Sequence, residues 1–420
     1  MKVAIAGGGI GGLATALMLH GAGIDVTVYE AVPEPRPLGV GINLLPHAVQ
    51  ELRRLGILER LLPLGVATEE LCYANRHGQF VWREPRGLAG GYSVPQLSIH
   101  RGKLQMALLE IARQRLGEAV VRTGRKVTGF VSDGGGPVRF HLEDSVTGRS
   151  YDEKADVLVG ADGIHSAIRA QLHPGDGTPR WSGQLMWRGT TLAPPFLTGK
   201  SMALIGTRGR KVVAYPLSAP DARGNALINW IAVLDNTAHG LPGAEDWNRP
   251  GRLEDFLPEF ASWSFPWLDV VELMRGAEGT YVYPMIDRDP LPTWTSGRTT
   301  LLGDAAHAMY PVGSNGASQA ILDARALTRA LLEEADPSAA LVRYEQERLP
   351  ATAAVVAANR NQGAARILDL AEERAPDGFD DVGNVFASGE REAIAADYQR
   401  VAGFTAAGVA AGGAGGRPGL

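Results

Sequence analysis

Residues 7–12, Gly7-Gly-Gly9-Ile-Gly-Gly12, decide the fold of this chain. They follow residues 2–6, a short apolar run that predicts a buried strand, and precede residues 13–20, which predict a helix. Residues 25–30 predict a second strand, so the chain opens with a strand, a helix and a strand. This order is typical of a parallel sheet with helices packed on its faces.

The spacing of these glycines fits the pattern G-x-G-x-x-G, in which each glycine has a separate task. Gly7 allows a tight turn, Gly9 lets the backbone approach a pyrophosphate, and Gly12 lets the helix pack closely on the strand. The pyrophosphate then meets a helix N-terminus, where backbone N–H groups favour an anion. Glu30 ends the second strand, 18 residues after Gly12, where a carboxylate can accept hydrogen bonds from ribose hydroxyls. The pattern therefore predicts a dinucleotide site that favours FAD or NAD over NADP.

Two later stretches extend this site. Residues 156–159 predict a short buried strand that ends in Gly160-Ala-Asp-Gly163, and residues 298–304 predict another that ends at Asp304. Residues 313–318 precede a predicted helix at 317–334, so their backbone N–H groups could stabilise an anionic reduced flavin. Each turn alone is an ordinary connection between a strand and a helix, but the three motifs together indicate FAD.

Composition excludes several classes of protein. The 53 glycines among 420 residues have no collagen period, and an apolar content of 45% is too high for general disorder. A net charge of -5 without a basic stripe excludes a nucleic-acid partner. Cys72 is the single cysteine, which excludes an intramolecular disulfide framework, and the nine histidines lack metal-binding spacing. No apolar run reaches about 18 residues, so we expect no membrane partner and a cytoplasmic location.

The three motifs resemble those of the group A FAD-dependent aromatic hydroxylases, which have the para-hydroxybenzoate hydroxylase fold. The resemblance runs from residue 1 to about residue 360, and further stretches bring it nearest to the phenazine-carboxylate hydroxylases of that family. These stretches are residues 36–43, 98–102, 186–189, 283–290 and 315–319. The resemblance implies that NADH or NADPH reduces FAD and that O2 then hydroxylates an aromatic ring through a C4a-hydroperoxyflavin. The chain has one dinucleotide fingerprint, so NAD(P)H would dock transiently.

The resemblance also implies an α/β fold, in which a Rossmann-like FAD-binding domain of the GR2 type carries an inserted, mostly antiparallel sheet domain. The residues agree with this, because strand-like pieces lie among aromatic side chains at 181–283. We expect the FAD-binding domain at 1–75, 101–178 and 291–345, the substrate domain at 76–100 and 179–290, C-terminal helices at 346–400, and a disordered tail at 401–420.

Group A motifs can be placed on this chain residue by residue. Those that the resemblance assigns to FAD are Gly7, Gly9, Gly11, Gly12, Glu30, Ala31, Arg36, Gly41, Arg101, Val127, Asp162, Gly163, Asp304, Gly313, Gly316, Ala317 and Ser318.

Substrate contacts are predicted at Arg188, Tyr215 and Trp230, because aromatic rings can stack on a planar substrate and a guanidinium can pair with a carboxylate. His47 and Pro311 are expected nearer the flavin, and together with Arg188 and Tyr215 they are the candidates for catalytic residues. For each of them an ordinary structural role stays open.

The predicted substrate is a small aromatic carboxylate, phenazine-like or phenolic. Salicylate, urate or a polyketide phenol stays open, because ring choice depends on a few pocket side chains. A non-catalytic FAD protein, loss of the carboxyl group during hydroxylation, and a homodimer are also left open.

Overall fold

The computed structural model describes residues 1–131, 136–241 and 249–414. Its first sheet has five parallel strands in the order β20-β12-β1-β2-β8. They are β1 (Lys2–Ala6), β2 (Asp25–Glu30), β8 (Val121–Thr123), β12 (Val157–Gly160) and β20 (Thr299–Leu301). The predicted opening of strand, helix and strand is confirmed.

Helices cover this parallel sheet and bury its apolar faces. α1 packs against both α4 and α8, and Leu13 and Leu17 of α1 lie in the same core as Val3 and Ile5 of β1. Gly117 follows the last residue of α4, and its φ of +98° favours glycine. The helices of this part are α1 (Ile10–Gly21), α2 (Pro46–Arg54), α3 (Leu58–Leu61), α4 (Arg101–Leu116), α5 (Ala167–Leu172), α7 (Asp304–His307) and α8 (Gly316–Glu333).

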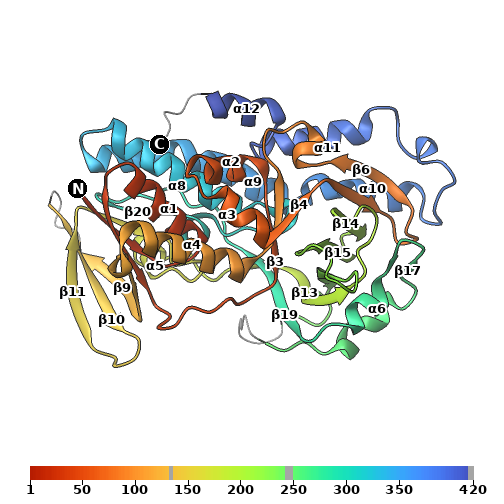
Figure 1. Cartoon of the computed structure of the whole chain (residues 1–420), viewed down its shortest axis with the longest axis horizontal. Coiled ribbons are helices and arrows are strands. Elements are labelled where there is room, and N and C mark those ends of the chain that lie inside the picture. The colour runs from red at the N-terminus through yellow and green to blue at the C-terminus, as the bar shows by residue number, and fades with distance from the viewer. Residues whose placement is uncertain (132–135, 242–248, 415–420) are drawn as a thin grey trace.

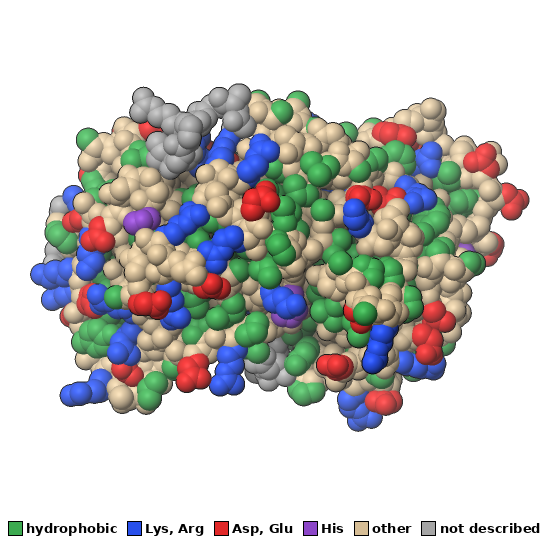
Figure 2. All heavy atoms as spheres, in the orientation of Figure 1, with side chains coloured by type: hydrophobic (Ala, Val, Ile, Leu, Met, Phe, Trp, Pro, Cys, Tyr) green, Lys and Arg blue, Asp and Glu red, His purple; other side chains and the backbone are tan. Residues whose placement is uncertain are grey.

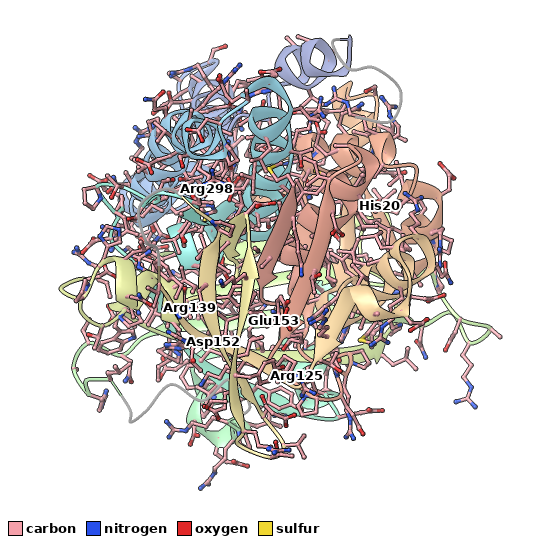
Figure 3. All side chains as sticks on the ribbon, turned by 90° about the vertical axis from the view of Figure 1, so that its left-hand side faces the viewer. His20, Arg125, Arg139, Asp152, Glu153 and Arg298 are labelled. Atoms are coloured by element: carbon pink, nitrogen blue, oxygen red, sulfur yellow. The ribbon has the colours of Figure 1, made fainter. Side chains whose placement is uncertain are left out.

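Two three-stranded antiparallel sheets flank the parallel one. The first has the order β11-β10-β9, with β9 (Arg125–Val131), β10 (Val138–Asp144) and β11 (Ser150–Ala155). Figure 3 shows its polar surface, where Arg125, Arg139, Asp152 and Glu153 lie close together. Glu153 joins this sheet to β2, because its carboxylate accepts a 2.6 Å hydrogen bond from the Tyr29 hydroxyl. The second has the order β3-β7-β4, with β3 (Gly41–Leu44), β4 (Gly65–Thr68) and β7 (Gln96–His100).

The largest sheet has seven strands in the order β19-β13-β16-β15-β14-β5-β6. They are β5 (Glu70–Ala74), β6 (Phe80–Pro85), β13 (Arg180–Ala193), β14 (Ser201–Gly206), β15 (Arg210–Pro216), β16 (Ala226–Asp235) and β19 (Thr280–Asp287). All its pairs are antiparallel except β14 with β5. The mostly antiparallel sheet is confirmed, and it includes β5, which precedes the expected boundary at residue 76. One face packs on an aromatic core with Trp230, Phe256 and Trp263, beside β17 (Ser264–Phe265), β18 (Leu268–Asp269) and α6 (Val270–Arg275).

C-terminal helices lie along the upper edge of Figure 1 and extend over both halves of the molecule. They are α9 (Pro337–Arg360), α10 (Arg366–Arg374), α11 (Glu390–Val401) and α12 (Ala406–Ala414). The expected disordered tail is wrong for residues 402–411, because Phe404 and Val409 are buried at 1% and 5% exposure. Residues 415–420 lie outside the described part of the chain.

Acidic and basic side chains alternate over the face of the molecule shown in Figure 2, and neither sign forms a large patch there. Within residues 1–131, 136–241 and 249–414, none of the helices combines the length and the apolar character needed to cross a bilayer.

Candidate active site

A cavity of about 390 Å³ lies between the parallel sheet and the seven-stranded sheet. Gly9, Gly163 and Asp304 line it from the loops that follow β1, β12 and β20. These loops stand at the carboxyl ends of three parallel strands, where open α/β sheets bind their ligands. The opposite wall is one face of the seven-stranded sheet. A ligand from the first wall and one from the second would therefore meet in the same space.

The glycine-rich turn after β1 is packed tightly on one side and open on the other. A Cβ atom at Gly12 would lie 2.1 Å from the carbonyl oxygen of Gly7, and one at Gly7 would lie 2.3 Å from that of Ala161. Gly9, in contrast, has no atom within 4 Å of the place where its Cβ would be. The helix N-terminus of α1 is therefore held against the strand while its first turn opens onto the cavity, as binding of a pyrophosphate requires.

Two carboxylates stand beside this turn. Glu30 accepts 2.7 Å hydrogen bonds from the backbone N–H groups of Gly8 and Val32, which fixes it at the end of β2. Asp162 accepts a 2.8 Å hydrogen bond from the Ala167 N–H through Oδ2, whereas its buried Oδ1 has no partner among the described residues. Burial raises the pKa of Asp162. An unpaired buried oxygen at this position is suited to a ligand that donates a hydrogen bond.

Gly313 and Ser314 shape the turn that leads into α8. Their φ angles are +68° and +60°, and a Cβ at Gly313 would lie only 1.8 Å from the Tyr398 hydroxyl oxygen. The N-cap residue Asn315 makes no side-chain cap to the first N–H groups of α8. These N–H groups can therefore serve an anion at the cavity, which Gly316 and Ala317 also line.

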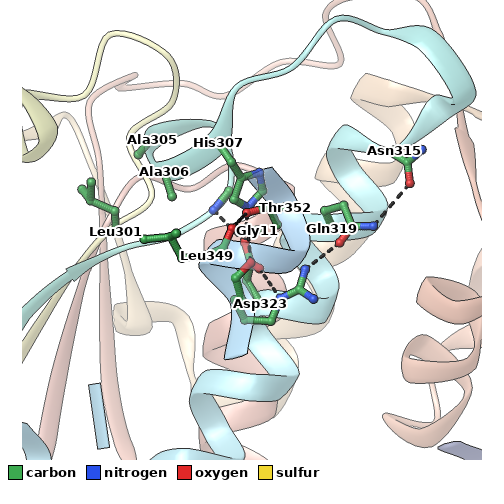
Figure 4. A network of polar contacts seen from close by, with 12 residues as sticks. Gly11, Leu301, Ala305, Ala306, His307, Asn315, Gln319, Asp323, Leu349 and Thr352 are labelled. Atoms are coloured by element: carbon green, nitrogen blue, oxygen red, sulfur yellow. Dashed lines mark hydrogen bonds and ion pairs between the residues drawn. The ribbon is translucent and has the colours of Figure 1, made fainter. Parts of the chain in front are cut away.

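A buried network of polar contacts supports this turn from behind (Figure 4). Asp323 accepts hydrogen bonds from the ring of His307 at 2.5 Å and from Arg348 at 2.7 Å. Burial alone would raise the pKa of Asp323, but His307 and Arg348 outweigh it and hold this pKa at about 2. Arg348 also donates to Gln319 at 2.6 Å, and Gln319 donates to Asn315 at 3.3 Å.

Tyr398 of α11 completes the network beside the cavity. Its hydroxyl accepts a 2.7 Å hydrogen bond from the Asn315 amide and donates to the Asn359 side chain, also at 2.7 Å. Tyr398 itself lines the cavity. Sequence reasoning missed this residue, since it lies in the C-terminal segment beyond the recognised motifs.

On the second wall, alternate residues of the sheet point into the cavity. Along β15 these are Lys211, Val213 and Tyr215, and on the neighbouring β16 they are Ile231 and Val233. Sequence reasoning had named Tyr215 but missed Lys211. The period of two along a strand was the signal that could have found it.

Arg188 of β13 is the cation nearest the junction of the two walls. Its Nη2 donates a 3.1 Å hydrogen bond to the Gly41 carbonyl, and its buried Nε has no partner among the described residues. No carboxylate of the described ranges pairs with it, and burial lowers its pKa. Burial also raises the pKa of the adjacent Tyr215 to about 12, so the phenol stays protonated.

Gly41 is the point where β3 meets this sheet. Its N–H donates a 2.7 Å hydrogen bond to Asn229, and a Cβ at Gly41 would lie 2.7 Å from the ring of Tyr215. Arg188 is therefore aimed by a backbone contact that only glycine permits at that place.

The structure contradicts the prediction that Trp230 contacts the substrate. Trp230 is fully buried on the opposite face of the sheet, where its Nε1 donates to Thr191 and its ring packs against Phe256. Its neighbour Ile231 faces the cavity instead, because successive side chains of a strand point to opposite faces.

Several other predicted residues do not reach the cavity wall. His47 packs against Phe404 at 5.8 Å between ring centroids, and burial lowers its pKa to about 3, which disfavours it as a proton acceptor from substrate. Arg36 is 73% exposed and pairs with Glu34, and Val127 lies in the core of β9. The predicted residues that also do not line the cavity are Gly7, Gly12, Glu30, Ala31, Asp162 and Ser318. Those that do line it are Gly9, Gly11, Gly41, Arg101, Gly163, Arg188, Tyr215, Asp304, Pro311, Gly313, Gly316 and Ala317.

Comparison with known proteins agrees with this geometry. Residues 1–227 and 286–359 match the family described as FAD binding domain. The chain belongs to this family. It is 49% identical to phenazine 1,6-dicarboxylic acid hydroxylase PhzS of Lysobacter antibioticus, over 86% of this chain and 90% of that protein. It is 32% identical to 3-hydroxybenzoate 6-hydroxylase 1 of Aquipseudomonas alcaligenes, over 84% of this chain and 86% of the relative.

Solved structures share the fold of this chain. A salicylate hydroxylase substrate complex aligns with a TM-score of 0.72 at 24% identity and covers 96% of this chain and 98% of that one. Klebsiella pneumoniae HpxO complexed with FAD and uric acid aligns with a TM-score of 0.71 over 98% of this chain and 95% of that one. The protein is thus an FAD-dependent aromatic monooxygenase with the para-hydroxybenzoate hydroxylase fold.

The residues present fit FAD. Gly9 leaves an open approach to the cavity, the first turn of α8 lines it without a side-chain cap, and Asp162 between the lining residues Ala161 and Gly163 has an oxygen without a described partner. Among the described residues no group of three or more His, Cys, Asp or Glu side chains could hold a metal ion.

Proposed function

We propose that the substrate is a planar aromatic carboxylate of the phenazine class, hydroxylated with NADH or NADPH as the reductant and O2 as the oxidant. The observation that carries this proposal is Arg188, a guanidinium without a carboxylate partner in the described chain that lines the cavity from the seven-stranded sheet. An unpaired buried cation is costly, so a bound anion would relieve it.

The named relatives support an acidic aromatic substrate. PhzS is called a phenazine dicarboxylic acid hydroxylase, and two further relatives act, by their names, on 3-amino-4-hydroxybenzoate and on 3-hydroxybenzoate. A carboxylate on an aromatic ring is common to all three, although the rings differ. PhzS, at 49% identity, favours the tricyclic ring.

In this proposal the FAD is held by the first wall, where Gly9, Asp304 and the turn at Gly313 lie around the cavity. When bound, FAD supplies the reducing equivalents and the activation of O2 that place one oxygen atom on the aromatic ring. Arg101, which begins α4 and lines the cavity, is placed to offset the phosphate charge.

The second wall positions the substrate. Arg188 binds its carboxylate, and Met186, Ile231 and Val233 of the sheet provide an apolar surface that excludes water from a flat ring. The carboxylate end would then lie near Gly41, where the two walls meet.

The reaction balances in two forms. In the first, Ar–H, O2, NAD(P)H and a proton give Ar–OH, NAD(P)+ and water. In the second, Ar–COOH replaces Ar–H, the C–C bond breaks, and CO2 leaves as the C–O bond forms.

The test uses the FAD-loaded protein with NADH or NADPH. Phenazine-carboxylic acids, salicylate, urate and simple phenols are added separately, nicotinamide oxidation is followed, and products are identified by mass. We expect a phenazine-carboxylic acid to accelerate oxidation most and to gain a hydroxyl group. Faster turnover with salicylate, urate or a phenol would reassign the substrate, and no acceleration by any of them would favour a non-catalytic FAD protein. The homodimer and the cytoplasmic location stay predictions, which light scattering and cell fractionation test.

A further inference from the structure

A second cation lies in the same cavity as Arg188. Lys211 lines the cavity from β15 and is only 7% exposed. Across the sheet, Arg188 pairs in register with Ile231 and through it with Val213, two residues from Lys211. Two strand spacings of roughly 5 Å and a two-residue step of roughly 7 Å place the two Cα atoms roughly 12 Å apart. The two cations therefore line the same cavity at separate positions, with Ile231 and Val213 between them.

Lys211 has a polar contact but no carboxylate within ion-pair distance among the described residues. Its Nζ donates a 2.6 Å hydrogen bond to the Gln362 side chain, and an ammonium carries three donors. The nearby carboxylate of Asp369 accepts from the Arg208 backbone N–H at 2.7 Å, and the described residues form no ion pair with Lys211. Two charged groups near Lys211 affect its pKa in opposite directions: Asp369 raises it and Arg208 lowers it. Two N–H donors thus remain for a ligand.

Arg86, another cation that lines the cavity, differs from Lys211 in having a direct ion-pair partner. The Glu84 carboxylate pairs with it at 2.7 Å. Arg86 is therefore held by a direct ion pair, whereas no described carboxylate pairs directly with Lys211.

Gln362 is held in an unusual backbone conformation next to this lysine. Its φ is +64°, in the left-handed region that is unfavourable for a residue with a Cβ. It is 6% exposed, and its side-chain oxygen directs the Nζ of Lys211. Strain of this kind is concentrated at functional sites.

We propose that Lys211 forms a second carboxylate subsite, so that the enzyme binds an aromatic dicarboxylate between Arg188 and Lys211. The inference rests on the proposed function, since it requires an aromatic acid in this cavity, and it assigns the second acidic group to a residue. Gln362 is the positioning residue of the subsite. A monocarboxylate would use Arg188 alone and leave the ammonium without a direct ion-pair partner.

The experiment compares phenazine-1,6-dicarboxylic acid with phenazine-1-carboxylic acid as ligands of the FAD-loaded enzyme. Dissociation constants come from the change in the flavin absorption spectrum on titration, for the parent protein and for Lys211→Met. The matched control is Lys200→Met, because Lys200 is exposed and pairs with Glu69 away from the cavity. Lys211→Arg tests whether positive charge restores binding.

We expect Lys211→Met to weaken the diacid by about tenfold to a hundredfold, as loss of a charge-assisted hydrogen bond predicts, and the monoacid by less than about threefold. Lys200→Met should change neither, and Lys211→Arg should recover part of the preference. If Lys211→Met fails to fold, Gln362→Glu replaces it, because a carboxylate at Gln362 would pair with the ammonium and should also weaken the diacid.

If Lys211→Met and Gln362→Glu both leave the ratio of the diacid and monoacid dissociation constants unchanged, the subsite is refuted while the proposed function stands. If neither acid binds the parent enzyme or accelerates NAD(P)H oxidation, the proposed function fails first, and the subsite with it.

Discussion

Replacing Tyr398 by phenylalanine isolates the contribution of α11 to the cofactor side of the cavity. The substitution removes one oxygen atom and keeps the ring, which lies 6.3 Å from that of Phe404 between centroids. Two hydrogen bonds of 2.7 Å are lost, one from Asn315 and one to Asn359. Both of these partners are 0% exposed, so water does not replace the hydroxyl.

Leaving a buried polar group unsatisfied costs roughly 1–3 kcal/mol. Asn359 loses the only partner shown for its oxygen, whereas the Asn315 amide keeps a 3.2 Å contact with the Gly313 carbonyl. We therefore expect a loss of about 2–4 kcal/mol in the free energy of unfolding, nearer the lower value if the Asn315 amide rotates. The turn at Gly313 would also lose its support, so FAD should dissociate more readily.

Denaturant unfolding followed by circular dichroism measures the stability, and ultrafiltration followed by flavin absorbance measures retained FAD. Tyr151→Phe is the control, since Tyr151 is 37% exposed on β11. A loss below about 0.5 kcal/mol in the free energy of unfolding, together with unchanged FAD retention, would refute the reasoning. It would show that the hydrogen bonds of Tyr398 do not support the turn at Gly313.

Four further predictions follow from the two walls. Gly12→Val should abolish FAD binding, because even its Cβ would lie 2.1 Å from a backbone oxygen; flavin absorbance per protein after reconstitution checks this, and a stoichiometric flavin would contradict it. Arg188→Met should raise the dissociation constant of a carboxylate substrate at least about tenfold, whereas Arg180→Met, at an exposed site on the same strand, should not, as titration of the flavin spectrum will show. Because burial lowers the pKa of Lys211 to about 8, diacid affinity should fall as the pH rises through 8 and the ammonium becomes neutral; the same titration in Lys211→Arg should show no such fall. Phe404→Ala should lower the free energy of unfolding by about 3–5 kcal/mol, measured with denaturant. A change near zero would indicate that the segment around Phe404 is not packed on the protein.

Local patterns were sufficient for much of the first wall. The spacing of glycines at 7–12 and the turns with Asp162 and Asp304 that follow two strands depend on residues close in sequence, so a short window predicts them. The family resemblance added Gly41, and side-chain chemistry pointed to Arg188 and Tyr215; all three line the cavity.

The second wall needed tertiary information. Whether Trp230 or Ile231 faces the cavity depends on the phase of β16, and a strand that is apolar on both faces does not reveal it. Tyr398 meets Asn315 across 83 residues, a contact that no local window contains. Residues 402–420 are rich in alanine and glycine, so their composition predicted disorder. It gave no sign that the side chain of Phe404 would be buried.

The cavity wall combines Gly9, near the start of the chain, with Tyr398 in α11. A ribosome must therefore synthesise the chain as far as α11 before the cofactor pocket can close, and pairing of β5 with β14 likewise waits for some 130 residues of intervening chain. Flavin capture then becomes a late folding event. Bound-flavin fluorescence would accordingly report completed tertiary assembly, and an incomplete chain would have no closed pocket in which reduced flavin could react with oxygen.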